Sequence, residues 1–246
     1  MTSWTMLRYA VVDVEGNGQQ PPDLVELAMV PIIGGAVGEP IEWMVRPDQP
    51  ITPMARRIHG ITNEMAEGAD TFVDVQKSVV EALNVDAIVA HAAHVDVGVL
   101  QRKLGDWQCP EVFDTLKLAR RLRPGLASYK LGALVDAFYL DVHLPAGLRP
   151  HRATYDALVC ARLFVNLVTQ TYPKPVTLEE LREQTPPGGD DEAPALSDHP
   201  RGLFISVDRP SGAGNATTPT PKAKSDASRS PTASWNASTP TPPDTS

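Results

Sequence analysis

This chain has few cysteines and no net positive charge. The first argues against a disulfide-rich or zinc-binding protein, and the second against a protein that covers long nucleic acid. Two cysteines occur in 246 residues, which gives neither a disulfide framework nor a zinc site. The formal net charge is −8 and the isoelectric point is about 5.2. The chain therefore lacks the global electrostatic footprint of a protein that covers long nucleic acid.

Targeting signals and long apolar runs are also lacking. Residues 1–8 have neither the basic start nor the apolar segment of a signal peptide. No apolar stretch is long enough to span a bilayer. We therefore expect a cytoplasmic protein with no membrane partner.

The pattern of hydrophobic residues predicts an α/β domain. Strands are expected at 9–15, 24–33, 41–45, 87–90 and 111–114. Helices are expected at 72–83, 115–123, 130–139 and 154–171, and a further helix is expected after the strand at 87–90, running to about Leu104. Short turns between the first three strands indicate an antiparallel meander, and the later strands alternate with helices. This order indicates a mixed five-stranded sheet flanked by helices.

The composition changes after residue 172. Residues 173–246 hold thirteen of the 24 prolines together with many serines, threonines, alanines and glycines. Such a segment cannot bury enough surface to order itself, so we expect a domain at 1–172 and a disordered tail at 173–246, with a short helix at 177–184. The apolar island at 203–207 has three open interpretations: a docking peptide for a protein partner, a segment packed on the domain, or a chance cluster.

Two acidic residues end the first predicted strand. Asp13 and Glu15 are two residues apart, and side chains on a strand alternate between faces, so both point the same way. Like charges in that arrangement repel unless a cation lies between them or one is protonated. The plain alternative is a solvated strand end, which explains the pair taken alone.

Two further carboxylates lie on apolar stripes of predicted helices. Asp96 shares its stripe with Val99 and Leu100, and Asp156 begins a stripe that continues through Val159. A carboxylate in such a place is costly to bury without a partner. For Asp96 the alternative is an acid that complements the dipole at the start of a helix.

Histidines accompany these acids. His151 precedes Asp156 by five residues, which corresponds to about 140° around a helix, so the two cannot share one helical face. We therefore expect Asp156 on a rigid helix and His151 on the loop before it, in a position that depends on substrate. His91 and His94 could be imagined as a zinc pair, but no cysteine or third histidine has ligand spacing. The all-oxygen set instead suits a hard cation such as Mg²⁺ or Mn²⁺.

Four blocks resemble the DEDDh 3′–5′ exonucleases, the group that includes the proofreading subunit of bacterial replicases. They are 11–18 (VVDVEGNG), 58–62 (IHGIT), 90–96 (AHAAHVD) and 151–157 (HRATYDA), and the resemblance covers roughly residues 7 to 170. It implies a ribonuclease H-like fold and the stepwise release of nucleoside 5′-monophosphates from a 3′ end. The chain departs from the usual pattern after Glu15, where the family often has Thr-Thr-Gly, and at Ala92, where it often has Asn.

The resemblance also implies a role for each residue of the site. Asp13, Glu15 and Asp156 would bind the ion that activates water, and Asp13 and Asp96 would hold a second Mg²⁺ or Mn²⁺ ion at the leaving oxygen. His151 would take the proton from the attacking water.

Further residues would contact the substrate, which is a single-stranded 3′ end of DNA or RNA, with DNA favoured. By resemblance these are Gly16, Asn17, Gly18 and His59. For His59 an alternative stays open, a residue that ends a helix before a capping Gly60. Several basic side chains could contact phosphates or be solvated: Arg56, Arg57, Arg102, Lys103, Lys117, Arg120, Arg121, Arg123, Arg149 and Arg152.

Two other functions remain open at this point. One is an RNA- or oligonucleotide-trimming exoribonuclease, because contacts to a 2′-hydroxyl depend on loop geometry. The other is a non-catalytic nucleic-acid-binding or adaptor module on the same fold, against which the full set of five site residues argues.

Overall fold

The structure, a computed structural model, describes residues 3–170 and 176–182. The predicted tail, with its apolar island at 203–207, lies outside the described residues apart from 176–182. In the described part no helix is both long enough and apolar enough to cross a membrane.

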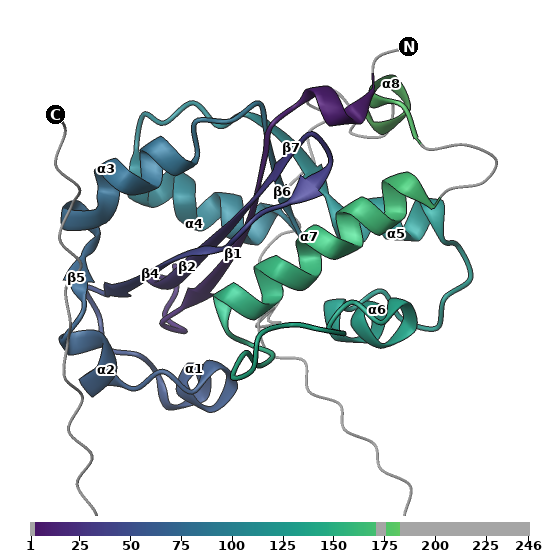
Figure 1. Cartoon of the computed structure of the whole chain (residues 1–246). Helices are drawn as coiled ribbons and strands as arrows, with labels where there is room; N and C mark the ends of the chain where they lie inside the picture. Colours follow the sequence, from purple (N-terminus) through teal and green to yellow (C-terminus); the bar gives the residue numbers. More distant parts are fainter. Residues whose placement is uncertain (1–2, 171–175, 183–246) are drawn as a thin grey trace, which may run out of the picture. The chain divides into compact units, whose positions relative to one another are not determined.

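A mixed sheet forms the centre of the domain (Figure 1). The five predicted strands are confirmed as β1 (Tyr9–Gly16), β2 (Leu24–Ile33), β4 (Ile41–Arg46), β6 (Ala87–Ala90) and β7 (Glu111–Asp114). Two strands of two residues each, β3 (Ala36–Val37) and β5 (Asp70–Thr71), extend the sheet beyond the prediction. The strand order is β5-β4-β2-β1-β6-β7, with β3 paired to β2. β1 is central, antiparallel to β2 and parallel to β6.

The predicted helices are present with bounds close to those expected. They are α3 (Phe72–Ala82), α4 (His94–Leu104), α5 (Thr115–Leu122), α6 (Leu131–Phe138), α7 (Ala153–Thr169) and α8 (Leu178–Arg182). The described part also contains the 3₁₀ turn η1 (Trp4–Met6) and two short helices, α1 (Pro53–His59) and α2 (Asn63–Glu67). α1 has strong local signals, because Thr52 caps its start, Pro53 occupies its first turn, and Gly60 ends it in the left-handed conformation.

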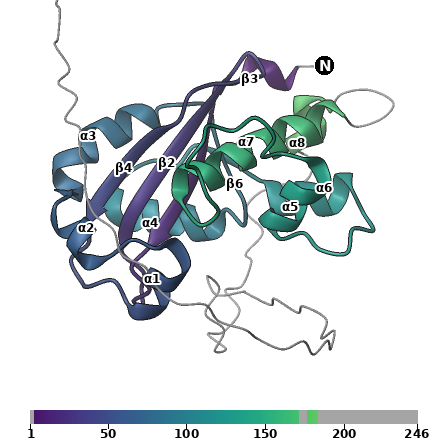
Figure 2. The same cartoon turned by 60° about the horizontal axis from the view of Figure 1, so that its bottom comes forward.

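Helices cover both faces of the sheet. α7 lies across one face together with α5 and α6, while α3 and α4 lie on the other (Figure 1). Figure 2 shows α1 below the lower end of β2, and α2 lies beside β4. Alternate residues of β1 enter the two cores: Tyr9 and Val11 pack on the α7 side, and Ala10 and Val12 pack on the α4 side. This alternation directs Asp13 and Glu15 toward α7.

Aromatic side chains meet in the core on the α7 side of the sheet. Tyr9 has its ring centroid 5.1 Å from that of Phe164 on α7 and 6.0 Å from that of Phe113 on β7. Its hydroxyl group donates a hydrogen bond of 2.6 Å to the carbonyl oxygen of Trp4. Leu178 and Leu181 of α8 are buried in the same core. The packing thus fixes α7, the helix that carries Asp156, firmly against β1.

Candidate active site

Three carboxylates meet where β1 ends and α7 begins. Ligand oxygens of Asp13, Glu15 and Asp156 all lie within 4.8 Å of one another, and the three side chains are partly buried. Two come from one face of a strand and the third from the first turn of a helix packed on that face. Three carboxylate oxygens at this separation fit the donor set of a hard divalent cation.

Asp96 is close to the cluster but is not part of it. It is 5% exposed, and its Oδ1 accepts a hydrogen bond of 3.0 Å from the backbone N–H of Val14. β6 pairs with β1 only as far as Val11, so the backbone N–H of Val14 has no partner in β6. The Asp96 carboxylate accepts the hydrogen bond from this N–H instead. A second ion shared by Asp13 and Asp96 stays a prediction.

The charges of these acids are unfavourable to one another. Burial, reinforced by the neighbouring carboxylates, raises the pKa of Asp13 well above its usual range and the pKa of Glu15 to about 8. Burial likewise raises the pKa of Asp96 to about 8 and the pKa of Asp156 to about 7. A bound cation would supply the missing opposite charge, so the residues present fit a divalent metal.

His151 lies next to Asp156 but outside α7. Its side chain is exposed and its backbone has a φ of 61°. The backbone N–H donates a hydrogen bond of 3.0 Å to Oδ2 of Asp156. The expected placement is confirmed: the aspartate is on the helix and the histidine is on the loop before it. Movement of His151 with substrate stays a prediction.

Glu26 is a site residue that sequence reasoning missed. It is fully buried on β2, opposite Glu15 in the strand register, and Arg152 forms a salt bridge with it. A single acid inside the apolar run 24–30 was the available signal, because such a residue needs a partner. Arg152 was a candidate for phosphate contact, but its guanidinium is engaged with Glu26.

The loop after β1 is held mainly by its own hydrogen bonds. Asn17 is fully buried, and its Oδ1 accepts hydrogen bonds from the backbone N–H groups of Gln19 and Asp23. Gly18 has a φ of 76°, and a Cβ there would lie 2.3 Å from Oγ1 of Thr52, so close packing on α1 requires glycine. Substrate contact by Gly16, Asn17 and Gly18 stays a prediction; the structure gives Asn17 and Gly18 a role in shaping the loop.

His59 is the last residue of α1 and is 1% exposed. Its Nδ1 accepts a hydrogen bond of 3.0 Å from the backbone N–H of Ile61, so the proton of the neutral ring is on Nε2. The ring interacts with the backbone of Gly16, but the buried Nε2 makes no hydrogen bond of full geometry among the described residues. Burial lowers the pKa of His59, which favours the neutral form.

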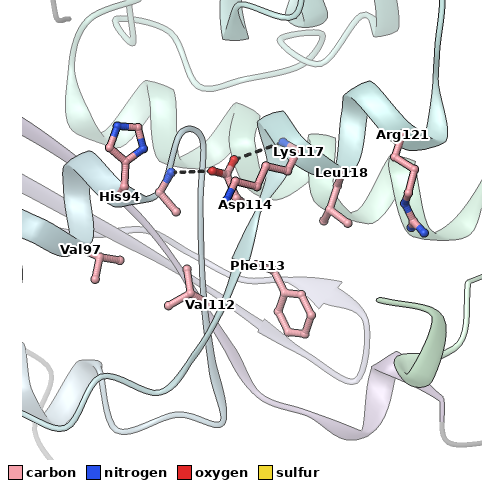
Figure 3. Close-up of a pocket in the computed structure, with 9 residues that line it drawn as sticks. His94, Val97, Val112, Phe113, Asp114, Lys117, Leu118 and Arg121 are labelled. Carbon is pink, nitrogen blue, oxygen red and sulfur yellow. Dashed lines mark hydrogen bonds between the residues drawn. The ribbon is translucent and has the colours of Figure 1, made fainter. Parts of the chain in front are cut away.

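His91 and His94 have different surroundings in the structure. His91 contacts the hydroxyl oxygen of Thr115 and the carbonyl oxygen of Tyr129, both at 3.0 Å. His94 lines a pocket of about 390 Å³ between α4, β7 and α5 (Figure 3). Within that pocket the Asp114 carboxylate accepts hydrogen bonds from the backbone N–H groups of Ala93 and Lys117, so it joins the starts of both helices (Figure 3). Neither histidine joins a group of three metal-ligand side chains in the described residues.

Comparison with known proteins identifies the family. The family model described as Exonuclease, of the RNase T type, matches residues 10–164. The chain belongs to this exonuclease family. Exodeoxyribonuclease 10 of Escherichia coli strain K12 is 39% identical over 163 residues, which are 66% of this chain and 69% of that protein. The DNA polymerase III subunit epsilon of Aquifex aeolicus is 27% identical and covers 67% of this chain and 82% of its own length.

A solved structure agrees with this assignment. Exonuclease X in complex with 5′ overhanging duplex DNA has a TM-score of 0.59 and 34% identity, covering 71% of this chain and 98% of that one. The ribonuclease H-like fold and the DEDDh resemblance are confirmed. The exonuclease is a phosphodiester hydrolase of the 3′–5′ class, and its family generally uses divalent metal ions.

Proposed function

We propose that this exonuclease removes nucleoside 5′-monophosphates one at a time from single-stranded 3′ ends, with DNA preferred. The observation that carries the proposal is the convergence of Asp13, Glu15 and Asp156 within 4.8 Å at the end of β1. The preference for DNA rests on two relatives, Exodeoxyribonuclease 10 and Exonuclease X in its DNA complex.

The cofactor of this reaction is two Mg²⁺ or Mn²⁺ ions. Asp13, Glu15 and Asp156 would hold one ion, and Asp13 with Asp96 would hold the other. Such ions lower the pKa of water and neutralise charge that develops on a phosphate. The raised pKa values of Asp13 and its neighbours support this part of the proposal, because four unneutralised acids in one place need positive charge.

His151 acts as the general base. A neutral imidazole has a ring nitrogen that can accept a proton from water. The water oxygen attacks phosphorus, and the bond from phosphorus to the 3′ oxygen breaks with its electron pair left on that oxygen. The proton of the water passes to His151, and the 3′ oxygen takes a proton from solvent. The exposed side chain of His151, beside Asp156, can reach a substrate that enters from solvent.

His59 contacts the terminal nucleotide. Its buried ring interacts with the backbone of Gly16, in the loop after β1, but its Nε2–H makes no hydrogen bond of full geometry in the described residues. An oxygen of the substrate would satisfy that donor.

One experiment tests the catalytic proposal. The protein is incubated with 5′-labelled single strands of DNA and RNA, with Mg²⁺, with Mn²⁺ or with chelator. Asp156→Asn is compared with Asp136→Asn, which alters an exposed aspartate on α6. The proposal expects a stepwise ladder on DNA that needs metal, is lost in Asp156→Asn and persists in Asp136→Asn.

Two results would contradict the proposal in different ways. No ladder on either strand with either metal would refute catalysis by this site. A ladder on RNA alone would replace the DNA preference with the exoribonuclease alternative.

A further inference from the structure

Glu26 is a carboxylate that the proposed chemistry does not use. It has no exposed surface and lies opposite Glu15 in the β1–β2 register. It is nevertheless absent from the group of side chains that could hold an ion. A buried carboxylate in an acidic neighbourhood is strongly unfavourable unless it is paired, so its contacts explain why it is there.

Within the described residues, the hydrogen bonds that the Glu26 carboxylate accepts come from the start of α7. Nε of Arg152 lies 3.0 Å from both carboxylate oxygens, and Nη2 of the same guanidinium completes a bidentate pair. The backbone N–H of Ala153, the first residue of α7, donates a hydrogen bond of 2.8 Å to Oε2. One buried side chain on β2 therefore holds both the cap residue and the first N–H of α7.

The residues that precede Arg152 connect this pair to the site. His151 precedes Arg152 directly and is hydrogen-bonded through its backbone to Asp156. On the other side of Pro150, Nη2 of Arg149 donates a hydrogen bond of 3.1 Å to the carbonyl oxygen of His59. The segment that carries His151 is thus attached to β2 at one end and to the end of α1 at the other.

We propose that Glu26 and Arg152 are a positioning pair for the exonuclease reaction. The pair fixes the first turn of α7, so that the Asp156 carboxylate stays within reach of Asp13 and Glu15 and the backbone of His151 stays beside it. Neither residue touches the reacting atoms. Arginine is required because only a planar guanidinium makes two parallel hydrogen bonds to one carboxylate. The inference rests on the proposed function, because it concerns the same site.

Arg152→Lys is the test variant, because it keeps the charge and removes the fork. The matched control is Arg182→Lys, in a second bidentate pair that Arg182 of α8 makes with Glu111 of β7 at 3.0–3.1 Å. The measurements are kcat and KM on labelled single-stranded DNA, Mn²⁺ binding by the metal-free protein, amide hydrogen exchange over residues 149–156, and thermal unfolding.

Arg152→Lys should lower kcat and Mn²⁺ affinity about 10- to 100-fold, the usual effect of losing a residue that orients a metal ligand. KM should stay within about twofold, because the substrate contacts are untouched. The amide of His151 should exchange faster. Arg182→Lys should leave kcat, Mn²⁺ affinity and His151 exchange unchanged. Glu26→Gln keeps one acceptor oxygen and should give a smaller loss of the same kind, which covers the case in which Arg152→Lys does not fold.

The inference would be overturned if Arg152→Lys and Glu26→Gln both had the same kcat and Mn²⁺ affinity as the unsubstituted protein. So would losses that merely follow the fraction of unfolded protein at the assay temperature. The proposed function fails separately: an inactive natural protein whose Mn²⁺ affinity and His151 exchange still respond to Arg152→Lys would refute catalysis and retain the positioning pair.

Discussion

Asp156→Asn should stabilise the metal-free exonuclease at alkaline pH while abolishing its activity. A carboxyl group whose folded-state pKa is raised stabilises the fold below its unfolded-state pKa and loses that contribution as pH rises through the folded value. Burial raises the pKa of Asp156 from 3.8 to about 7. At about 1.36 kcal/mol per pH unit, the ionised group costs on the order of 4 kcal/mol, of which roughly 3 kcal/mol appears between pH 5 and pH 9.

Asparagine removes this cost and keeps most of the local structure. Its Oδ1 can still accept the hydrogen bond from the backbone N–H of His151, which is 3.0 Å long in the natural protein. The stability advantage of Asp156→Asn should therefore grow by roughly 3 kcal/mol from pH 5 to pH 9. For a domain of this size that corresponds to about 6–12 °C in the melting temperature.

The assay is thermal unfolding in chelator at pH 5, 7 and 9, with Asp136→Asn as the control. Saturating Mn²⁺ should reverse the order, because the natural protein alone keeps the full ligand set and gains stability from binding. An advantage that does not grow with pH, or that Asp136→Asn shares, would show that the cluster is not electrostatically strained.

Three further results are expected. His151→Gln should lower kcat about 10²- to 10⁴-fold and leave Mn²⁺ affinity within about twofold, since the side chain is not a ligand; equal loss of both would assign it to metal binding. A chain ending after residue 172 should be less stable than one ending after residue 182 by several kcal/mol in urea unfolding, because Leu178 and Leu181 are buried and each contributes about 1.5–3 kcal/mol; equal midpoints would mean that α8 does not pack on the core. Ala92→Gly should stabilise the protein by roughly 1 kcal/mol in the same assay, because Ala92 has a φ of 59° that costs an L-residue about this much; destabilisation would show that unfolded-chain entropy dominates.

Local patterns in the sequence were sufficient for the framework of the fold. The strand at 9–15 follows from its β-branched residues, the strand at 87–90 from a short apolar run, and the helix at 154–171 from the apolar stripe. The structure differs from these bounds by two residues at most. Periodicity predicted neither α1 nor α2, because seven and five residues are too short for it to appear. The end of α1 was expected only as the alternative for His59, and the structure confirms it, since His59 is the last residue of the helix and Gly60 caps it. The capping residues at the starts of the two helices, Thr52 and Thr62, were the better signal.

The four sequence blocks, through the family resemblance that they carry, determined the chemical class of this protein: acids at the end of a strand and at the starts of two helices, with a histidine before the last. The arrangement of these residues depended on contacts distant in the chain. Packing of α7 on β1 places Asp156 near Asp13 and Glu15. Because β6 is short, the N–H of Val14 can donate to Asp96. Arg152 pairs with Glu26, which is 126 residues away in the chain. Such contacts are invisible to periodicity, because their free energy comes from burial and charge pairing between elements and not from the sequence near each residue.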